Sequence, residues 1–187
     1  IMNSKDLCLI EYLPNLMEAG VSSFKIEGRM RSAHYVATVI SVYRKAIDTC
    51  FNNPENYIVK KEWLQELEKV SHRPYSTGFA VHKPDSNSQV YASSSYVQTH
   101  DFVAWVLDYD TKNKRVFLEE RNHLEEGEEL EFLMPDGTIK KFILQDMQNE
   151  VGEKITVAPH AQEHFSAFCD FNVLKNSMVR RKIKDNL

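Results

Sequence analysis

The sequence predicts an α+β chain in two parts, an α/β segment followed by a small antiparallel β-barrel. Two patterns predict this arrangement. Helix and strand patterns alternate up to about residue 84, and six or seven short strand patterns follow at regular spacing. The polar stretch 83–88 between them is the best candidate for a linker, so we expect domains at residues 1–84 and 85–187.

The first part begins with a helix pattern, a strand pattern and a second, longer helix pattern. Within residues 5–19 apolar residues recur at helical spacing, and Pro14 predicts that this helix either kinks or begins only near it. Residues 22–27 predict a strand that ends at Gly28. Ser32 is the expected N-cap of a helix reaching Cys50, and residues 61–70 predict a short amphipathic helix.

This order of elements implies a parallel sheet, because strands joined through helices pair in parallel. The first part holds two βα units at most, whereas a complete α/β barrel needs about 250 residues. It is therefore either an appendage or the tail end of a larger barrel. The loop 72–79 that follows either touches substrate or docks the linker, and we favour docking.

The second part predicts short strands joined by polar turns. Pro135-Asp136-Gly137 is a strong hairpin signal, because an Asp-Gly pair tolerates positive φ. The basic stretch 178–182 either meets RNA phosphate or is a charged C-terminal tail. The expected strands are 102–107, 115–119, 129–134, 138–144, 154–157, 165–173 and 178–181.

Composition and charge exclude several classes of protein. A chain of 187 residues with 42% hydrophobic residues can bury a core, so it is not disordered. No apolar run approaches the roughly 20 residues of a membrane span, and three distant cysteines make no disulfide framework, which favours the cytoplasm. Residues 1–84 hold 11 Lys and Arg against 9 Asp and Glu, whereas residues 85–187 hold 12 against 18. A surface that binds nucleic acid everywhere is therefore not expected.

Four charged residues near the predicted strand 22–27 are the candidate site. Lys25 and Glu27 share one strand face, and in a barrel that face points inward, where catalytic groups collect. A buried pair here could position a substrate or tune the pKa of a neighbouring group. The alternative is a structural ion pair that closes the end of the barrel. Arg29 and Arg31 suit an anion such as phosphate or carboxylate, and the alternative is that both are solvated surface side chains. The scattered histidines show no zinc spacing, so no metal site is expected within these residues.

Five motifs follow one another along the chain: 2–7 (MNSKDL), 25–29 (KIEGR), 43–48 (YRKAID), His72-Arg73 and 77–79 (TGF). In this order they resemble the C-terminal part of peptidase family U32, the collagenase-like proteases, some of whose members are tRNA hydroxylation proteins. The resemblance covers essentially the whole chain. It implies a parent protein with an N-terminal α/β barrel, of which residues 1 to about 80 are the last βα elements, followed by a β-barrel similar to the second domain of elongation factors.

The resemblance also implies functional expectations. The family's cysteine cluster, which holds an iron–sulfur centre in relatives, would lie upstream of Ile1, so we expect no cofactor here and an inactive chain when alone. Lys25, Glu27 and Arg29 are the motif positions carried over as site residues. The parent is expected to be cytoplasmic and to act in tRNA wobble-uridine hydroxylation, with tRNA and the missing barrel domain as partners and no DNA or membrane contact. The alternatives are a non-catalytic RNA- or protein-binding module and a purely structural support for the barrel.

Overall fold

A computed structural model describes residues 4–83, 85, 88–91 and 96–183. The chain divides into two compact units, Ile1–Thr99 and His100–Leu187, called unit 1 and unit 2 below. Pro84, where the domain boundary is predicted, lies outside the described residues, so the boundary stays a prediction. The first two residues of the MNSKDL motif also lie outside the described residues. No helix among the described residues is long and apolar enough to cross a membrane.

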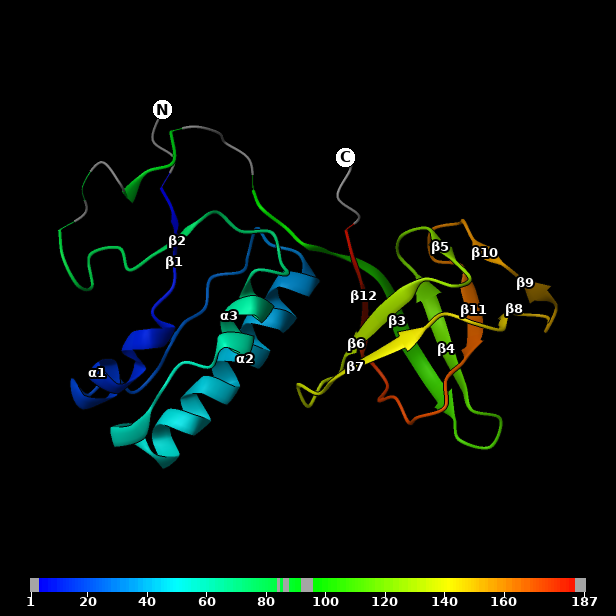
Figure 1. Ribbon diagram of the computed structural model, residues 1–187, viewed down its shortest axis with the longest axis horizontal. Helices are drawn as coiled ribbons and strands as arrows, with labels where there is room; N and C mark the ends of the chain where they lie inside the picture. The colour runs from blue at the N-terminus through cyan, green and yellow to red at the C-terminus, as the bar shows by residue number, and fades with distance from the viewer. Residues whose placement is uncertain (1–3, 84, 86–87, 92–95, 184–187) are drawn as a thin grey trace. The chain divides into compact units, whose positions relative to one another are not determined.

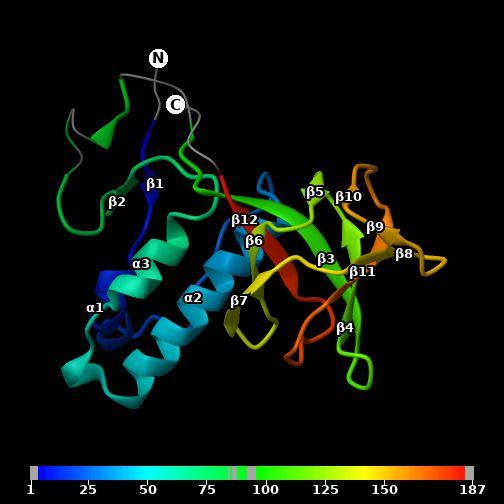
Figure 2. The ribbon, with the colours of Figure 1, turned by 45° about the vertical axis from the view of Figure 1, so that its right-hand side comes forward.

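Unit 1 is built around one long helix, α2 (Ala33–Asn52), with α3 (Lys61–Leu67) beside it (Figures 1 and 2). Ser32 is the N-cap, as predicted, and its hydroxyl accepts a hydrogen bond from the Tyr35 N–H at 3.2 Å. The short helices η1 (Ile10–Tyr12) and α1 (Leu13–Glu18) precede it, with Pro14 in the first turn of α1. Of the two predicted outcomes, the helix beginning near Pro14 is confirmed, because α1 begins at Leu13 and proline is well tolerated in a first turn.

Two short strands close unit 1, β1 (Asp6–Leu7) and β2 (Tyr75–Ser76), which pair in parallel. Backbone hydrogen bonds from Asp6 N to Pro74 O and from Cys8 N to Ser76 O, at 3.0 and 2.9 Å, hold them together. The loop that contains β2 also pairs with the chain leading to unit 2, because the backbones of His72 and Val97 exchange two hydrogen bonds of 3.0 and 2.8 Å. The second 3-10 turn, η2 (Pro54–Asn56), follows α2. The core of unit 1 comprises Ile10, Leu13, Val39, Val42, Ala46, Cys50, Trp63, Leu67 and Val70.

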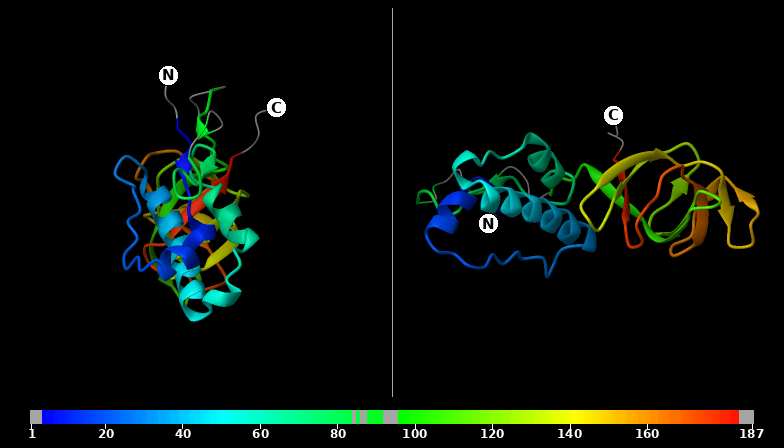
Figure 3. Two further views of the ribbon diagram at one scale, coloured as in Figure 1. Left: turned by 90° about the vertical axis from the view of Figure 1, so that its left-hand side faces the viewer. Right: turned by 90° about the horizontal axis from the view of Figure 1, so that it is seen from below.

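The predicted strand 22–27 is not formed. The segment runs along α2 on the side opposite α3 (Figure 3), and its backbone makes no hydrogen bond among the described residues. Burial still alternates, because Phe24 and Ile26 pack against the core while Lys25 and Glu27 are exposed. The period-two pattern is thus present without the ladder, since a strand needs a neighbouring backbone to pair with.

Unit 2 is one antiparallel sheet with an additional strand pair. The sheet has the order β7-β6-β12-β3-β4-β11-β8-β9, and β5 pairs with β10. The strands are β3 (His100–Asp110), β4 (Arg115–Glu120), β5 (Leu124–Glu125), β6 (Glu129–Leu133), β7 (Ile139–Ile143), β8 (Met147–Asn149), β9 (Lys154–Ile155), β10 (Val157–Ala158), β11 (His164–Phe168) and β12 (Met178–Lys182).

Two predictions about unit 2 meet different outcomes. The hairpin at Asp136-Gly137 is confirmed, since Gly137 has φ of +79° and the Met134 N–H donates to Thr138 O at 2.9 Å. The charged-tail interpretation of 178–182 is wrong, because β12 lies between β6 and β3 inside the sheet (Figure 1). Core residues of all the larger strands, among them Val103, Val116, Leu118, Phe132, Phe165 and Val179, form one cluster. The two-part α+β organisation with mostly antiparallel pairing is therefore confirmed.

Candidate functional site

A pocket of about 600 Å³ in unit 1, called the unit 1 pocket, brings together all four predicted site residues. Its lining contains four cationic side chains against two carboxylates, which favours an anionic ligand. Apolar side chains from Leu9, α1, the segment 22–27 and α2 form the rest of the wall. The charged residues are Asp6, Lys25, Glu27, Arg29, Arg31 and Arg73, and the apolar ones include Leu9, Leu13, Leu16, Phe24, Ile26 and Val39.

A tight turn between the segment 22–27 and α2 positions the two predicted arginines. Gly28 is required there, because a Cβ at this position would lie 2.7 Å from Val36 Cγ2 on α2. The Arg29 N–H donates to Glu27 Oε1 at 2.9 Å, and the Arg31 N–H donates to Gly28 O at 3.0 Å. The Glu27 carboxylate therefore stabilises the turn that carries Arg29 and Arg31.

Lys25, Glu27 and Arg29 are exposed at the pocket. No ion pair joins Lys25 to Glu27, and neither the Lys25 nor the Arg29 side chain has a polar partner in the part of the chain that the structure describes. The structure thus does not form the buried Lys–Glu pair considered from the sequence, because no strand among the described residues covers this face. Catalytic roles for Lys25 and Glu27 stay predictions.

Arg31 already binds an anion of the same chain. Its Nη2 donates to Asp6 Oδ2 at 2.7 Å and its Nη1 to Ser71 O at 3.1 Å. Arg73 binds the same carboxylate, with Nε donating to Asp6 Oδ1 at 3.1 Å and its backbone N–H to Oδ2 at 3.2 Å. Asp6 therefore ties β1 to two distant segments. Sequence reasoning missed Asp6 and Arg73 as site residues, since no local pattern signals pairings 25 and 67 residues apart.

Two tyrosines supply neutral hydroxyls to the pocket. Tyr43 Oη accepts a hydrogen bond from the Leu9 N–H at 3.2 Å and lies 3.5 Å from Cys8 Sγ. Burial raises the pKa of Tyr43 and that of Tyr35 above the ordinary phenol value. Both groups therefore keep their protons at neutral pH and can donate hydrogen bonds to a ligand.

The cysteines do not fit the iron–sulfur centre that the family resemblance implies for the parent. Cys8 and Cys50 lie in unit 1 and Cys169 lies in unit 2. Burial raises the pKa of the Cys50 and Cys169 thiols, which disfavours the thiolate that iron requires. No group of three or more His, Cys, Asp or Glu side chains among residues 4–83, 85, 88–91 and 96–183 could hold a metal ion.

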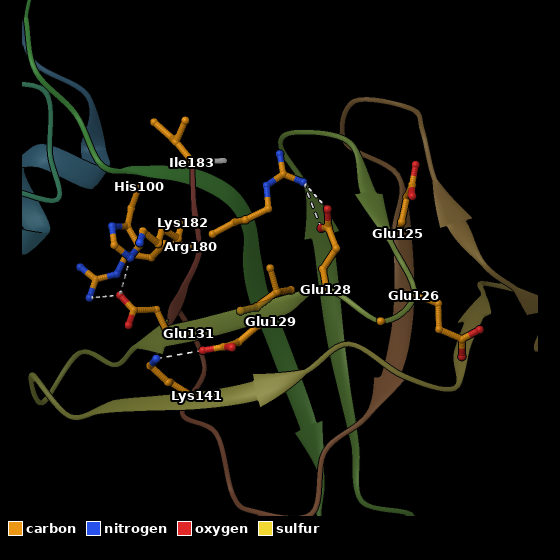
Figure 4. A pocket seen from close by; sticks show the side chains of 13 residues that line it. His100, Glu125, Glu126, Glu128, Glu129, Glu131, Lys141, Arg180, Lys182 and Ile183 are labelled. Carbon is orange, nitrogen blue, oxygen red and sulfur yellow. Dashed lines mark hydrogen bonds and ion pairs between the residues drawn. The ribbon is translucent and has the colours of Figure 1, made fainter. Parts of the chain in front are cut away.

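A second pocket, of about 590 Å³, lies in unit 2 and differs in charge (Figure 4). Five glutamates and four lysines or arginines line it together with His100. The cations bind carboxylates: Lys141 reaches Glu129 at 2.8 Å and Arg180 reaches Glu131 at 2.7 Å (Figure 4). Arg181 makes two bonds to Glu128, at 2.8 and 3.0 Å. The basic stretch of β12 is thus largely neutralised by neighbouring acids.

The fold and the unit 1 pocket define a two-unit α+β protein whose first unit offers a charged, ligand-sized pocket and whose second is an antiparallel sheet. The chain belongs to peptidase family U32. The family description "Peptidase family U32" matches residues 1–90, and "Peptidase family U32 C-terminal domain" matches residues 98–180. The resemblance of the opening motifs is thereby confirmed.

Three relatives show how far the sequence similarity extends along the chain. The chain is 39% identical over 180 residues to "tRNA hydroxylation protein P1" of Bacillus subtilis (strain 168), covering 96% of this chain and 43% of that protein. It is 34% identical over 159 residues to "tRNA hydroxylation protein P" of Escherichia coli (strain K12), covering 85% and 34%. A "Collagenase" of Porphyromonas gingivalis (strain ATCC BAA-308 / W83) is 38% identical over 79 residues, covering 42% and 19%. The chain spans less than half the length of each of these relatives.

Proposed function

We propose that this chain is the C-terminal part of a U32 enzyme that acts on tRNA in the cytoplasm, in wobble-uridine hydroxylation. The observation that carries the proposal is the extent of similarity. The tRNA hydroxylation protein of Bacillus subtilis matches nearly the whole chain, whereas the collagenase matches less than half of it. The positive lining of the unit 1 pocket is consistent with an anionic substrate such as RNA.

We propose further that unit 1 is the last βα portion of a larger α/β barrel and that unit 2 is a small β-barrel. The unpaired backbone of 22–27, with its alternating burial, supports the first statement, because adjacent barrel strands would satisfy those N–H and C=O groups. In the complete barrel Lys25 and Glu27 would face an enclosed site. The chain alone lacks that enclosure, so we expect it to be inactive.

In this proposal Lys25 and Glu27 position the substrate, Arg29 binds an anionic group, and Arg31 acts through its ion pair with Asp6. Proteolysis receives less support from the same residues. The described lining of the unit 1 pocket contains Ser23 but neither histidine nor cysteine, so it offers no nucleophile next to a general base.

The test uses the full-length parent protein in a bacterial strain that lacks its own tRNA hydroxylation genes. Nucleosides of total tRNA are measured by mass spectrometry after expression of the wild-type parent, of Glu27→Gln, and of the 187-residue chain alone. We expect 5-position hydroxylation of the wobble uridine with the wild type only, and an unchanged melting temperature for Glu27→Gln. Absence of modified uridine with the wild-type parent would refute the proposal, and a large stability loss in Glu27→Gln would make that residue architectural.

A non-catalytic RNA- or protein-binding module is the second candidate. The observation that favours it is that the unit 1 pocket has an anion-attracting lining without a nucleophile–base pair. In the same strain, full modification by a parent that carries both Lys25→Gln and Glu27→Gln would support this candidate. It would show that neither side chain is needed for the reaction, as expected if unit 1 only binds.

A further inference from the structure

Three planar groups are layered beside the unit 1 pocket. The Arg31 guanidinium lies over the Tyr35 ring, 4.9 Å from its centroid, and over the Tyr96 ring, 4.8 Å from its centroid. Arg73 also lies over Tyr96, at 5.6 Å. Asp6 holds both guanidinium groups through its two carboxylate oxygens, so the layers are fixed in place. We call Tyr35, Arg31 and Tyr96 the Tyr–Arg–Tyr stack.

The outer layer of this stack remains accessible. Tyr96 keeps 49% of its surface exposed although two guanidinium groups pack on it. A partly exposed aromatic ring backed by a cation offers a flat, electron-rich surface on which another planar group can stack. Unpaired nucleobases are such groups, and proteins that bind single-stranded RNA use tyrosine and arginine planes in this way.

Two cations that line the same pocket as Arg31 and Tyr35 are available for phosphate. Lys25 and Arg29 are exposed and have no polar side-chain partner among the described residues. In unit 2, by contrast, Arg180 and Arg181 of β12 bind Glu131 and Glu128, and the sequence from residue 85 onward is net acidic. Charge complementarity therefore places a polyanion on unit 1.

We infer that unit 1 carries the RNA-contact surface of this protein: an unpaired base stacks on Tyr96 while phosphates of the same strand contact Lys25 and Arg29. The inference rests on the proposed function for the class of partner and adds where and how it binds. It also assigns the basic strand β12 a role inside the sheet, in place of the phosphate contact considered from the sequence.

The test measures binding of a fluorescein-labelled anticodon stem-loop RNA to the 187-residue chain by fluorescence anisotropy at several salt concentrations. Tyr96→Leu keeps apolar bulk but removes the ring, and Tyr96→Phe keeps the ring. We expect Tyr96→Leu to weaken binding at least fivefold, since one stacked base contributes about 1–3 kcal/mol, and Tyr96→Phe to bind within twofold of wild type. The matched control is Tyr91→Leu, because Tyr91 is 72% exposed and outside the stack.

The phosphate contacts are tested by Lys25→Gln/Arg29→Gln, matched in charge by Lys112→Gln/Lys182→Gln in unit 2. Log affinity falls as log salt rises, and each lost phosphate contact makes this slope shallower by about 0.7. We therefore expect the slope to become shallower by about 1.4 for the first pair and to stay unchanged for the second. Undetectable binding at low salt, equal loss for both pairs, or loss in Tyr96→Phe equal to that in Tyr96→Leu would overturn the inference. Fluorescence of Trp63 in unit 1 and of Trp105 in unit 2 verifies that both units of each variant are folded.

These outcomes are separable from those of the proposed function. A parent that hydroxylates tRNA while the chain shows no stem-loop binding leaves the function standing and overturns the surface. If the parent does not hydroxylate tRNA but the chain binds the stem-loop with the expected dependence on Tyr96 and on salt, the RNA-contact surface is supported. The proposed reaction is then refuted.

Discussion

Replacing Asp6 by asparagine tests whether one carboxylate holds unit 1 together. Asp6 accepts hydrogen bonds from Arg31 and from both the side chain and the backbone of Arg73. Asparagine keeps the shape but removes the charge, which leaves two guanidinium groups facing each other without a counter-ion. The expected result is a loss of stability in unit 1.

The magnitude follows from the burial of the three side chains. Breaking a fully buried ion pair costs about 3–5 kcal/mol. Here the side chain of Asp6 is 10% exposed, and those of Arg31 and Arg73 are 20% and 23% exposed. Water therefore solvates the stranded arginines in part, and we expect a loss of about 2–3 kcal/mol in the free energy of unfolding.

The two tryptophans allow the units to be measured separately. Trp63 lies in the core of unit 1 and Trp105 lies on β3 of unit 2. Urea unfolding is followed by Trp63 fluorescence in a Trp105→Phe background, and by Trp105 fluorescence in a Trp63→Phe background. We expect Asp6→Asn to lower the urea midpoint of unit 1 only.

Asp48→Asn is the matched control, because Asp48 pairs with Arg44 on the surface of α2 with both side chains more than half exposed. Exposed pairs of this spacing contribute about 0.3–0.5 kcal/mol. If Asp6→Asn and Asp48→Asn cost the same within 0.5 kcal/mol (about the error of such measurements), the reasoning is refuted.

Three further predictions concern other features. Gly28→Ala should destabilise unit 1 by about 1–3 kcal/mol in the same urea assay, because its Cβ would lie 2.7 Å from Val36 Cγ2; an unchanged midpoint would contradict this packing. Burial raises the pKa of Glu120, whose Oε2 has no hydrogen-bond partner among the described residues, so its contribution to stability is present at acidic pH and lost as pH rises through the raised pKa. Glu120→Gln should therefore stabilise unit 2 at pH 8 more than at pH 4, and a pH-independent difference would count against it. Cys50 and Cys169 should react with iodoacetamide far more slowly in the native protein than in urea, as peptide mass spectrometry can measure, because burial both shields these thiols and raises their pKa.

Features set by neighbouring residues could be predicted from the sequence. The Ser32 cap, the helix start at Pro14 and the Asp136-Gly137 hairpin depend on contacts within four residues, and all three are present. The alternating burial of 22–27 was predictable for the same reason.

Features set by distant residues could not be predicted. The strand 22–27 lacks a ladder because its pairing depends on backbone outside the segment itself. The position of β12 between β6 and β3 depends on the order of strands in the sheet, which hydrophobic periodicity does not encode. In the candidate site, the turn at Gly28 was visible in the sequence, whereas the capture of Arg31 by Asp6 and its stacking on Tyr96 were not.

The parallel pairing of β1 with β2 has a mechanical consequence. In the described chain β1 precedes the helices of unit 1 and β2 follows them. Tension along the backbone pulls two such parallel neighbours past each other lengthwise, so their hydrogen bonds and the Asp6–Arg73 contact resist together and do not open one at a time. We therefore expect this strand pair to oppose stretching when an unfolding motor pulls the chain, and to separate before the helices between the two strands unravel.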